Sequence, residues 1–326
     1  MGPKVSVIIP VKKINDYLSQ ETVPAILKQI YSNFEIIVLP DKPTKEKLPK
    51  TKIIPTWPKT GPADKRDLGA QKATGEILAF LDDDSYPDKN WLKKAVKIFR
   101  EGKAITAVCG PTLTPPHDNL RQKASGYVWS TWLGSGGAGT YRCAAQPRRE
   151  VEDFPSVNFL VRRKDFSTVG GFDSHFWPGE DTKLCLDLVY QLKKKIIYDP
   201  GVLVYHHRRE VFGPHLKQIA RYAIHRGHFA RILPQTSLQV GYLVPTLFVL
   251  GLIIGLPLLF IYPLFKLIYL AAILVYLVLL LATSTQVYLR EKNLKLAFLV
   301  TFTIVVTHLT YGVLFVRGFF SRKIRQ

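Results

Sequence analysis

A short apolar run that ends in three consecutive aspartates places the strongest constraint on this chain. Residues 77–81 (ILAFL) form a continuous hydrophobic stretch, which suits a strand buried on both faces of a parallel sheet. Residues 82–84 are all aspartate, and adjacent carboxylates repel one another unless something offsets their charge. A divalent cation with oxygen ligands, Mg²⁺ or Mn²⁺, that bridges a phosphate would do so. An acidic loop before the next helix, with Asp88 as its N-cap, is the alternative.

Strands and helices alternate through the first 110 residues. Strands are predicted at 5–10, 34–39, 53–54 and 76–81, and helices at 17–30, 63–73 and 89–101. This order predicts βαβ units and a mainly parallel sheet, in which ligands bind at the carboxyl ends of the strands. Asp41 and the 82–84 aspartates both follow strands. The sequence therefore predicts an acidic site at one edge of the sheet.

The pattern is weaker between residues 109 and 147. Residues 134–139 (GSGGAG) match the GxGxxG pattern of dinucleotide-binding proteins. That pattern needs a strand before it, a helix after it and an acidic residue about 20 positions later, and these are absent from the sequence. A mobile glycine-rich loop near the site is the preferred interpretation.

Regular structure resumes between residues 151 and 210. A strand is predicted at 157–162, a turn at 170–173 (GGFD), and an amphipathic helix after Gly179-Glu180-Asp181. Acidic residues at the start of a helix are favoured by its dipole and need no catalytic role. Short strands at 196–197 and 202–205 then lead to the basic sequence His206-His207-Arg208-Arg209.

The last third of the chain indicates membrane association. Residues 213–235 are predicted to form a basic amphipathic helix that suits the membrane interface or packing against the domain that precedes it. Hydrophobic segments follow at 241–262, 267–289 and 296–316, each close to the roughly 20 residues that span a bilayer. The net charge of +20 favours anionic lipids and phosphorylated substrates as partners. Nucleic acid is disfavoured, because recognisable binding motifs are absent.

The charges around these segments bear on the topology. Three spans with a cytosolic catalytic domain place Arg290, Lys292 and Lys295 inside, as the positive-inside rule prefers. The same arrangement places the basic residues after the last segment outside, which the rule disfavours; they are Arg317, Arg322, Lys323 and Arg325. Prolines 245, 257 and 263 make the first segment a candidate re-entrant hairpin. We expect three spans. The three cysteines, odd in number and without a CxxC motif, suit a reducing cytosol.

The motifs in their order resemble the family-two glycosyltransferases. They are VSVIIPV, EIIVLPD, RDLGAQKATGEILAFLDDD, NFLVRR, GGFD and GEDTKLCLDL, within residues 5–210. The resemblance implies an inverting enzyme of the GT-A fold, an α/β fold with a mainly parallel sheet, that uses a nucleotide-sugar donor. The predicted domains are a catalytic domain at 1–210, an interfacial helix at 211–237, and a transmembrane region with a basic tail at 238–326. The tail is similar to that of membrane-anchored members that build exopolysaccharide or lipid-linked glycans of the cell envelope.

The resemblance also implies roles for individual residues. Asp181 matches the catalytic base, with Glu180 beside it, and Asp84 and His206 match the metal ligands. The residues that match donor contacts are Pro10, Asp41, Arg66, Asp67, Asp82 and Asp83. The family commonly has an asparagine at the position of Asp67. Candidate contacts to the acceptor or the diphosphate are Asn158, His207, Arg208 and Arg221.

The expected activity is metal-assisted transfer of a sugar to a lipid-linked or glycan acceptor, with Mn²⁺ or Mg²⁺ as cofactor. The protein is expected in the cytoplasmic membrane, with its catalytic domain in the cytoplasm. A processive polysaccharide synthase is one alternative, although residues 218–222 read QIARY where such enzymes have QxxRW. A non-catalytic nucleotide-sugar sensor is another, and a nucleic-acid-binding protein is a third. The intact acidic motifs disfavour the sensor, because a binding module does not need Asp181.

Overall fold

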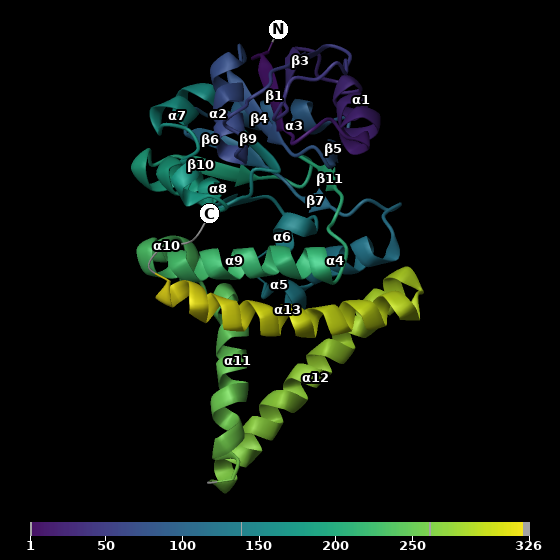
Figure 1. The fold of residues 1–326 in the computed structure, drawn as a ribbon, viewed down its shortest axis with the longest axis vertical. Coiled ribbons are helices and arrows are strands. Elements are labelled where there is room, and N and C mark those ends of the chain that lie inside the picture. Colours follow the sequence, from purple (N-terminus) through teal and green to yellow (C-terminus); the bar gives the residue numbers. More distant parts are fainter. Residues whose placement is uncertain (1, 138, 261, 322–326) are drawn as a thin grey trace. The chain divides into compact units, whose positions relative to one another are not determined.

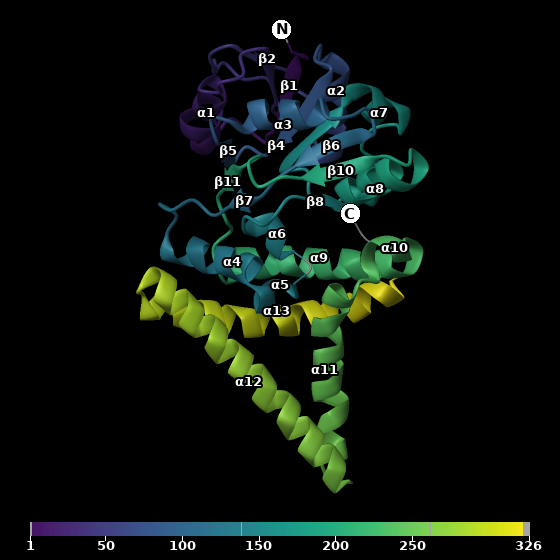
Figure 2. The same cartoon turned by 180° about the vertical axis from the view of Figure 1, so that it is seen from behind.

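The computed structural model describes residues 2–137, 139–260 and 262–321, so the tail residues Arg322, Lys323 and Arg325 lie outside the described residues. The chain divides into two compact units, shown in Figures 1 and 2. The first unit comprises residues 1–113 and 145–207, and the second comprises residues 114–144 and 208–326. These boundaries differ from the predicted ones, because residues 114–144 belong with the C-terminal segment.

An eight-stranded sheet forms the centre of the first unit, in the order β3-β2-β1-β4-β9-β6-β10-β8. The strands are β1 (Val5–Pro10), β2 (Phe34–Leu39), β3 (Thr51–Ile53), β4 (Ile77–Leu81), β6 (Ile105–Cys109), β8 (Arg149–Val151), β9 (Asn158–Arg162) and β10 (Lys195–Tyr198). Strand β1 pairs in parallel with β2 and β4, and β10 pairs in parallel with β6. The predicted mainly parallel sheet is therefore confirmed. Strand β9 runs antiparallel between β4 and β6, a reversal that the strand pattern did not reveal.

A second, three-stranded sheet lies in the same unit, in the order β5-β11-β7. Its strands are β5 (Ser85–Pro87), β7 (Thr112–Leu113) and β11 (Val204–His206). Strand β11 pairs antiparallel with β5 and parallel with β7. The first residue of β5 directly follows the three aspartates, and β11 ends one residue before the first unit does. This sheet therefore places the last residues of the first unit next to the aspartates.

Helices cover both faces of the large sheet. Helices α1 (Val23–Leu27) and α3 (Trp91–Phe99) pack on the face of Val5, Val7 and Ile9. Helices α2 (Pro62–Lys72) and α7 (Arg163–Thr168) cover the opposite face. Gly69 of α2 lies so close to Ile8 that an added Cβ would be 2.5 Å from its methyl carbon, and Phe166 of α7 packs 5.4 Å from Phe80.

Two helices differ from the prediction in detail. The helix expected at 17–30 consists of a π-helical turn (Tyr17–Thr22) followed by α1. Pro24 accounts for the irregularity, since proline lacks the N–H that an α-helix needs. The cap of α3 is Asn90, whereas Asp88 accepts a 2.9 Å hydrogen bond from the Asn90 backbone N–H. The helix predicted after Gly179 is α8 (Glu180–Leu186), which continues into a π-helical turn.

The second unit is helical. Its elements are α4 (Leu120–Ser130), α5 (Trp132–Ser135), α6 (Thr140–Cys143), α9 (Gly213–Ile232), α10 (Pro234–Ser237), α11 (Val240–Leu258), α12 (Pro263–Glu291) and α13 (Leu294–Phe320). Ala124 and Val128 of α4 pack with Val300 and Ile304 of α13, which explains why residues 114–144 join this unit. Helices α11, α12 and α13 are long and apolar enough to span a membrane, as the sequence predicts.

The glycine-rich segment, expected to be a loop, connects two short helices, α5 and α6. Thr131 caps α5 by accepting a hydrogen bond from the Gly134 N–H, and Gly136 and Gly137 follow with φ of 62° and 75°. Ala138 lies outside the described residues. Because those φ values favour glycine, the turn itself accounts for these two glycines without a bound dinucleotide.

Candidate functional site

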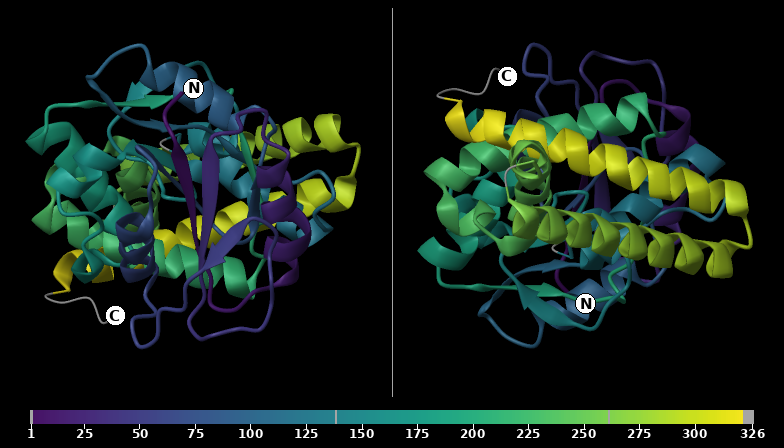
Figure 3. Two further views of the ribbon diagram at one scale, coloured as in Figure 1. Left: turned by 90° about the horizontal axis from the view of Figure 1, so that it is seen from above. Right: turned by 90° about the horizontal axis from the view of Figure 1, so that it is seen from below.

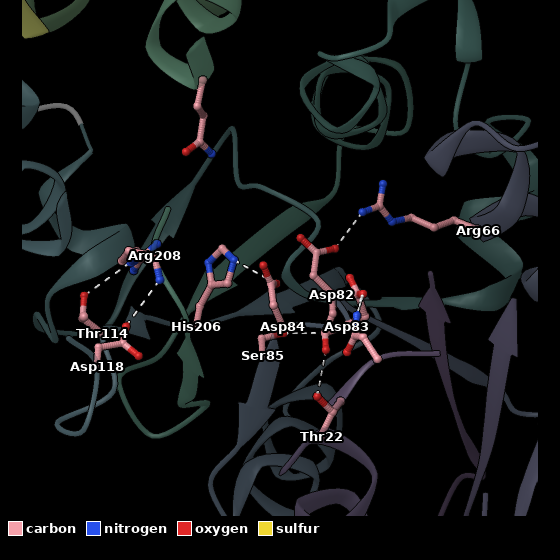
Figure 4. A network of polar contacts seen from close by, with 12 residues as sticks. Thr22, Arg66, Asp82, Asp83, Asp84, Ser85, Thr114, Asp118, His206 and Arg208 are labelled. Atoms are coloured by element: carbon pink, nitrogen blue, oxygen red, sulfur yellow. Dashed lines mark hydrogen bonds and ion pairs between the residues drawn. The ribbon is translucent and has the colours of Figure 1, made fainter. Parts of the chain in front are cut away.

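The three consecutive aspartates point to three different partners (Figure 4). Asp82 accepts a 2.9 Å hydrogen bond from Arg66, and Asp83 accepts one from Asn15. Asp84 lies 3.2 Å from His206 Nε2. The backbone turns sharply here, because the Ser85 hydroxyl and N–H both donate to the Asp82 carbonyl, at 2.7 and 3.3 Å. This turn directs the three side chains to different partners, while one carboxylate oxygen of Asp82 stays within 4.8 Å of one of Asp84.

His206 reaches the aspartates through strand pairing. His206 ends β11 and is paired with Ser85 of β5, and the His207 N–H donates to the Asp84 carbonyl at 3.0 Å. One ligand atom from each of Asp82, Asp84 and His206 lies within 4.8 Å of the others. Two carboxylate oxygens and an imidazole nitrogen form a donor set that suits a divalent cation such as Mn²⁺. The structure thus brings the predicted metal ligands together with Asp82.

Asp83 lies on the other side of the turn. Its carbonyl accepts a 3.3 Å hydrogen bond from the Thr22 hydroxyl. Burial, together with the neighbouring carboxylates of Asp84 and Asp82, raises the pKa of Asp83 to about 7. Asp83 therefore fastens the turn to the segment before α1, whereas Asp82 and Asp84 face the candidate metal site.

Arg66 links this cluster to the second acidic motif. It projects from α2, is 6% exposed, and forms ion pairs with Asp82 at 2.9 Å and with Glu180 at 3.1 Å. Glu180 and Asp181 are the first two residues of α8. Arg66 was expected at the donor, and here it also holds the start of α8 beside the aspartates.

The two acids of α8 have different environments. Glu180 is 5% exposed, and burial, followed by repulsion from Asp181, raises its pKa to about 7. Asp181 is half-buried, and its carboxylate accepts hydrogen bonds from the N–H groups of Thr182 at 2.8 Å and Ser156 at 3.4 Å. Asp181 is thus the more accessible of the two carboxylates, as a proton acceptor must be.

Lys65 was missed by the sequence analysis. It is 3% exposed and its ammonium group binds the Asp41 carboxylate and, at 2.6 Å, the Val11 carbonyl. Asp41 follows β2, and Pro10 ends the neighbouring β1, so the predicted acidic edge of the sheet is present. The sequence alone could not identify Lys65, because its position at this edge depends on which face of α2 is buried. Lys65 precedes Arg66 on α2, and both cations face this edge.

Asp67 is placed differently from the other predicted donor contacts. Its carboxylate accepts a 2.9 Å hydrogen bond from the Phe172 N–H and lies against Gly171, whose φ of 82° defines the GGFD turn. Burial, with a smaller contribution from the nearby Asp64, raises the pKa of Asp67 to about 7. The described contacts give Asp67 a structural role in holding the turn against α2.

We expect Asp67→Asn to stabilise the protein above neutral pH. An amide oxygen can accept the same bond from Phe172 without ionising, whereas the native carboxyl, with its raised pKa, loses stability as the pH rises from about 4 through about 7. The free energy of unfolding at pH 8 should rise by roughly 1–2 kcal/mol, discounted for partial exposure, with no gain at pH 4. Denaturant unfolding in detergent at both pH values measures this. Asp16→Asn, at an exposed aspartate, is the control, and equal stabilities at pH 8 would contradict the expectation.

Asn158 requires a correction. It was predicted as a contact to the acceptor or diphosphate, but its side chain is fully buried. Its amide nitrogen donates to the carbonyls of Gly110 and Val202, both at 2.8 Å, and its oxygen accepts from the Trp91 indole at 2.9 Å. These bonds occupy its polar atoms within the core, so Asn158 has no surface to offer a substrate.

Asn158→Ala should therefore reduce stability far more than activity. Each buried polar group left without a partner costs about 1–3 kcal/mol, so we expect a loss of about 3 kcal/mol or more in the free energy of unfolding. Activity per folded molecule should change only a few-fold. Asn33→Ala, which removes a single bond to the Gly2 carbonyl, is the matched control. A large fall in turnover by folded protein would restore the substrate role.

The remaining predicted residues lie in separate places. His207 is 5% exposed, stacks on Tyr17 at 4.2 Å and lies 3.2 Å from Glu21. Arg208, in the second unit, binds Asp118 and Thr114, both at 3.4 Å. Arg221 is exposed on α9. In the same helix, Gln218 donates to the Tyr222 hydroxyl at 3.2 Å.

Comparison with known proteins is consistent with this arrangement. The model of "Glycosyl transferase family 2" matches residues 6–170. A glucosyl-dolichyl phosphate glucuronosyltransferase of Haloferax volcanii is 23% identical over 224 residues, covering 62% of this chain and 69% of its own. A pre-mycofactocin glycosyltransferase of Mycobacterium tuberculosis is 29% identical over 153 residues, covering 46% of this chain, which spans only 30% of that relative.

A solved structure extends the similarity to the fold. The mannosyltransferase PcManGT of Pyrobaculum calidifontis, determined with GDP-Man and Mn²⁺, superposes with a TM-score of 0.54 and 19% identity. The match covers 95% of this chain and 87% of that one. The GT-A type of sheet expected from the sequence is thereby confirmed.

Proposed function

Because this chain belongs to glycosyl transferase family 2, and is therefore a glycosyltransferase, we propose that it transfers a sugar from a nucleotide-diphospho-sugar with inversion at the anomeric carbon. The acceptor in this proposal is a lipid-linked sugar, a polyprenyl phosphate or a growing glycan. The reaction takes place at the cytoplasmic face of the membrane. A divalent cation assists it.

The cluster of Asp82, Asp84 and His206 is the single observation that carries the proposal. A diphosphate leaving group needs its negative charge neutralised, and a divalent cation held by these groups would serve as Lewis acid and template. The mannosyltransferase with the similar fold was solved with both GDP-Man and Mn²⁺. Asp41, with Lys65 beside it, lies at the same edge of the sheet and is the proposed contact to the nucleotide.

Asp181 is the proposed general base. With a sugar hydroxyl as acceptor, it removes the hydroxyl proton as that oxygen attacks the anomeric carbon, and the diphosphate departs from the opposite side; a polyprenyl phosphate would attack through an oxygen that is already ionised. A single displacement needs no covalent nucleophile, so inversion follows from the geometry of attack. Arg66 positions the base, because its ion pairs with Asp82 and Glu180 fix the start of α8.

Membrane association supports a lipid-linked acceptor. Three long apolar helices follow the catalytic unit in sequence, and the Haloferax volcanii relative is named for a dolichyl phosphate substrate. A hydrophobic acceptor stays within the bilayer, so an enzyme anchored there meets its substrate by diffusion in two dimensions.

Nucleotide release by the detergent-purified full chain tests the proposal. UDP-, GDP-, dTDP- and CMP-sugars are supplied in turn with Mn²⁺, Mg²⁺ or EDTA, with and without a lipid extract from the native membrane. We expect metal-dependent turnover of one donor, stimulated by the extract. Donor binding by calorimetry without turnover under all of these conditions would favour the nucleotide-sugar sensor instead.

A further inference from the structure

We propose that α13 lies along the membrane surface beside α9 and does not cross the bilayer, so that only α11 and α12 cross it. The surface partner in this proposal is the interfacial layer of the lipid bilayer. By length and composition alone, α13 qualifies as a span, and the sequence analysis expected three spans. The packing within the second unit gives a different topology.

Helices α9 and α13 run side by side in the same direction (Figures 1 and 3). Near the start of α9, the rings of Phe212 and Phe302 lie 5.4 Å apart. One turn later, His215 Nε2 lies 3.0 Å from the Thr307 hydroxyl. Residue numbers rise together along both helices, which defines a parallel pair.

The contact becomes closest toward the ends of the two helices. A Cβ added to Gly227 would lie 2.1 Å from the Phe315 carbonyl oxygen, and one added to Gly318 would lie 2.1 Å from that of Ile224. Glycine at both positions lets the two backbones touch. At the end of α13, the Ser321 carbonyl accepts hydrogen bonds from Arg231 and, at 3.0 Å, from His228. The pair is therefore held from one end of α9 to the other.

Helix α9 cannot cross a bilayer. It carries Lys217, Arg221 and Arg231 exposed along its length, and Arg226 half-buried. Cations on the surface of a helix are strongly disfavoured at the centre of a membrane, whereas a basic amphipathic helix is stable at the interface. A helix that lies parallel to α9 throughout must take the same orientation. Helix α13 is accordingly excluded from crossing.

The degree of burial also distinguishes α13 from the other two apolar helices, α11 and α12. Within the most apolar 18-residue stretch of each helix, 39% of the residues of α13 are buried in the protein, against 11% for α11 and 6% for α12. The exposed large residues of α13 form one stripe with helical spacing, suited to contact with lipid: Leu294, Phe298, Phe302, Leu309, Val313 and Phe320. A single apolar stripe opposite a buried face is the pattern of an interfacial helix.

Helices α11 and α12 diverge from this pair (Figures 1 and 3). Helix α11 meets α13 where Gly312 lies against Val249 and the Pro245 carbonyl. Its 19 residues extend roughly 28 Å, close to the hydrocarbon thickness of a bilayer. Helix α12, with 29 residues, is long enough to return at a tilt, and its end connects to α13 through Lys292 and Asn293.

Two crossings also satisfy the charge rule that three crossings violate. Both ends of α13 then lie on the side of α9, which begins a few residues after β11 of the catalytic unit. Arg290, Lys292 and Lys295 lie on this side together with Arg317. In the sequence between the apolar parts of α11 and α12, the opposite side receives only Lys266. The basic residues are thus concentrated on the catalytic side, as the positive-inside rule prefers.

Cysteine labelling of the full chain in sealed vesicles tests the topology. In a Cys143→Ser background, with Cys109 and Cys185 buried, single cysteines replace Lys42, Lys266, Lys295 and Ser321. Lys42→Cys, in the first unit, marks the side of the membrane on which that unit lies. A membrane-impermeant maleimide is applied from one side at a time. We expect Lys295→Cys and Ser321→Cys to react from the side of Lys42→Cys, and Lys266→Cys to react from the other side.

Reaction of Ser321→Cys from the side opposite Lys295→Cys would overturn the proposal, because α13 would then cross. Reaction of Lys266→Cys from the Lys42 side would also overturn it, since the α11–α12 hairpin would not cross. If Ser321→Cys reacts from neither side, green fluorescent protein fused after Gln326 decides. In bacterial cells this fusion is expected to fluoresce, and a dark but stably expressed fusion would count against the proposal.

Discussion

Replacing Asp181 with asparagine should abolish sugar transfer while the donor still binds. Asparagine keeps the shape of the side chain, and its single amide oxygen can accept the 2.8 Å hydrogen bond from the Thr182 N–H, although it loses the longer bond from the Ser156 N–H to the other carboxylate oxygen. It cannot take a proton at neutral pH. General-base catalysis contributes typically about 10²- to 10⁴-fold in rate, so turnover should fall by that factor. Nucleotide release measures the loss, and calorimetry with the donor and Mn²⁺ measures retained binding.

Asp187→Asn is the matched control for this experiment. Asp187 directly follows α8 and forms an ion pair with Lys183, which is four residues away in the helix. Both side chains are partly exposed, at 18% and 24%, and an exposed pair contributes only about 0–1 kcal/mol, so the control should keep nearly full turnover. If Asp181→Asn retained activity at the level of Asp187→Asn, Glu180 would become the candidate base, and Glu180→Gln the next variant to measure.

Removing His206 or Asp84 should abolish metal-dependent donor binding. Both contribute to the cluster at which we propose a divalent cation. Loss of an outer-shell partner already lowers metal affinity by roughly 10- to 100-fold, so His206→Ala and Asp84→Asn should weaken Mn²⁺ binding by about 100-fold or more. Titration of Mn²⁺ in the presence of the nucleoside diphosphate, followed by calorimetry, measures the affinity directly and does not require turnover.

His175→Ala is the control for the loss of an imidazole, because the His175 side chain is 90% exposed and lies 2.8 Å from Asp173, which is outside the proposed cation cluster. It should leave the affinity for Mn²⁺ unchanged. Unaltered Mn²⁺ affinity in both His206→Ala and Asp84→Asn would show that this cluster does not hold the cation. The proposed role of Asp181 could still be correct in that case, since the two experiments have separate readouts.

The sequence predicted the acidic edge of the sheet well, for a physical reason. Strands such as β1, β2 and β4 are short apolar runs with clear ends, and the carboxyl ends of parallel strands meet at one edge. Asp41 and the aspartates after β4 could therefore be placed together from sequence alone. The motif order further predicted His206 as their partner, and its pairing with Ser85 confirms that the two segments meet.

Contacts between distant segments could not be read from a single sequence. Whether Arg66 bridges Asp82 and Glu180 depends on which face of α2 is buried, and that face also decides the position of Lys65. For Asn158 the sequence analysis predicted a substrate contact that the structure does not support. An amide at the end of a strand can hydrogen-bond within the core or to a ligand, and the local sequence is the same in both cases. The membership of residues 114–144 in the second unit depends on the apolar face of α4, which pairs with a helix far away in the sequence.

Strand β11 has only three residues, and its last one is His206. A few residues later the chain enters α9, a long helix of the second unit, which also contains the three candidate membrane spans. The last residue of the proposed cation site is therefore only a few residues from the first helix of the C-terminal segment that carries the candidate membrane spans. A soluble fragment ending at this strand would leave its imidazole on a fraying terminus. Enzyme preparations that omit the anchor should consequently be judged first by their cation affinity, before any absence of turnover is attributed to a missing lipid substrate.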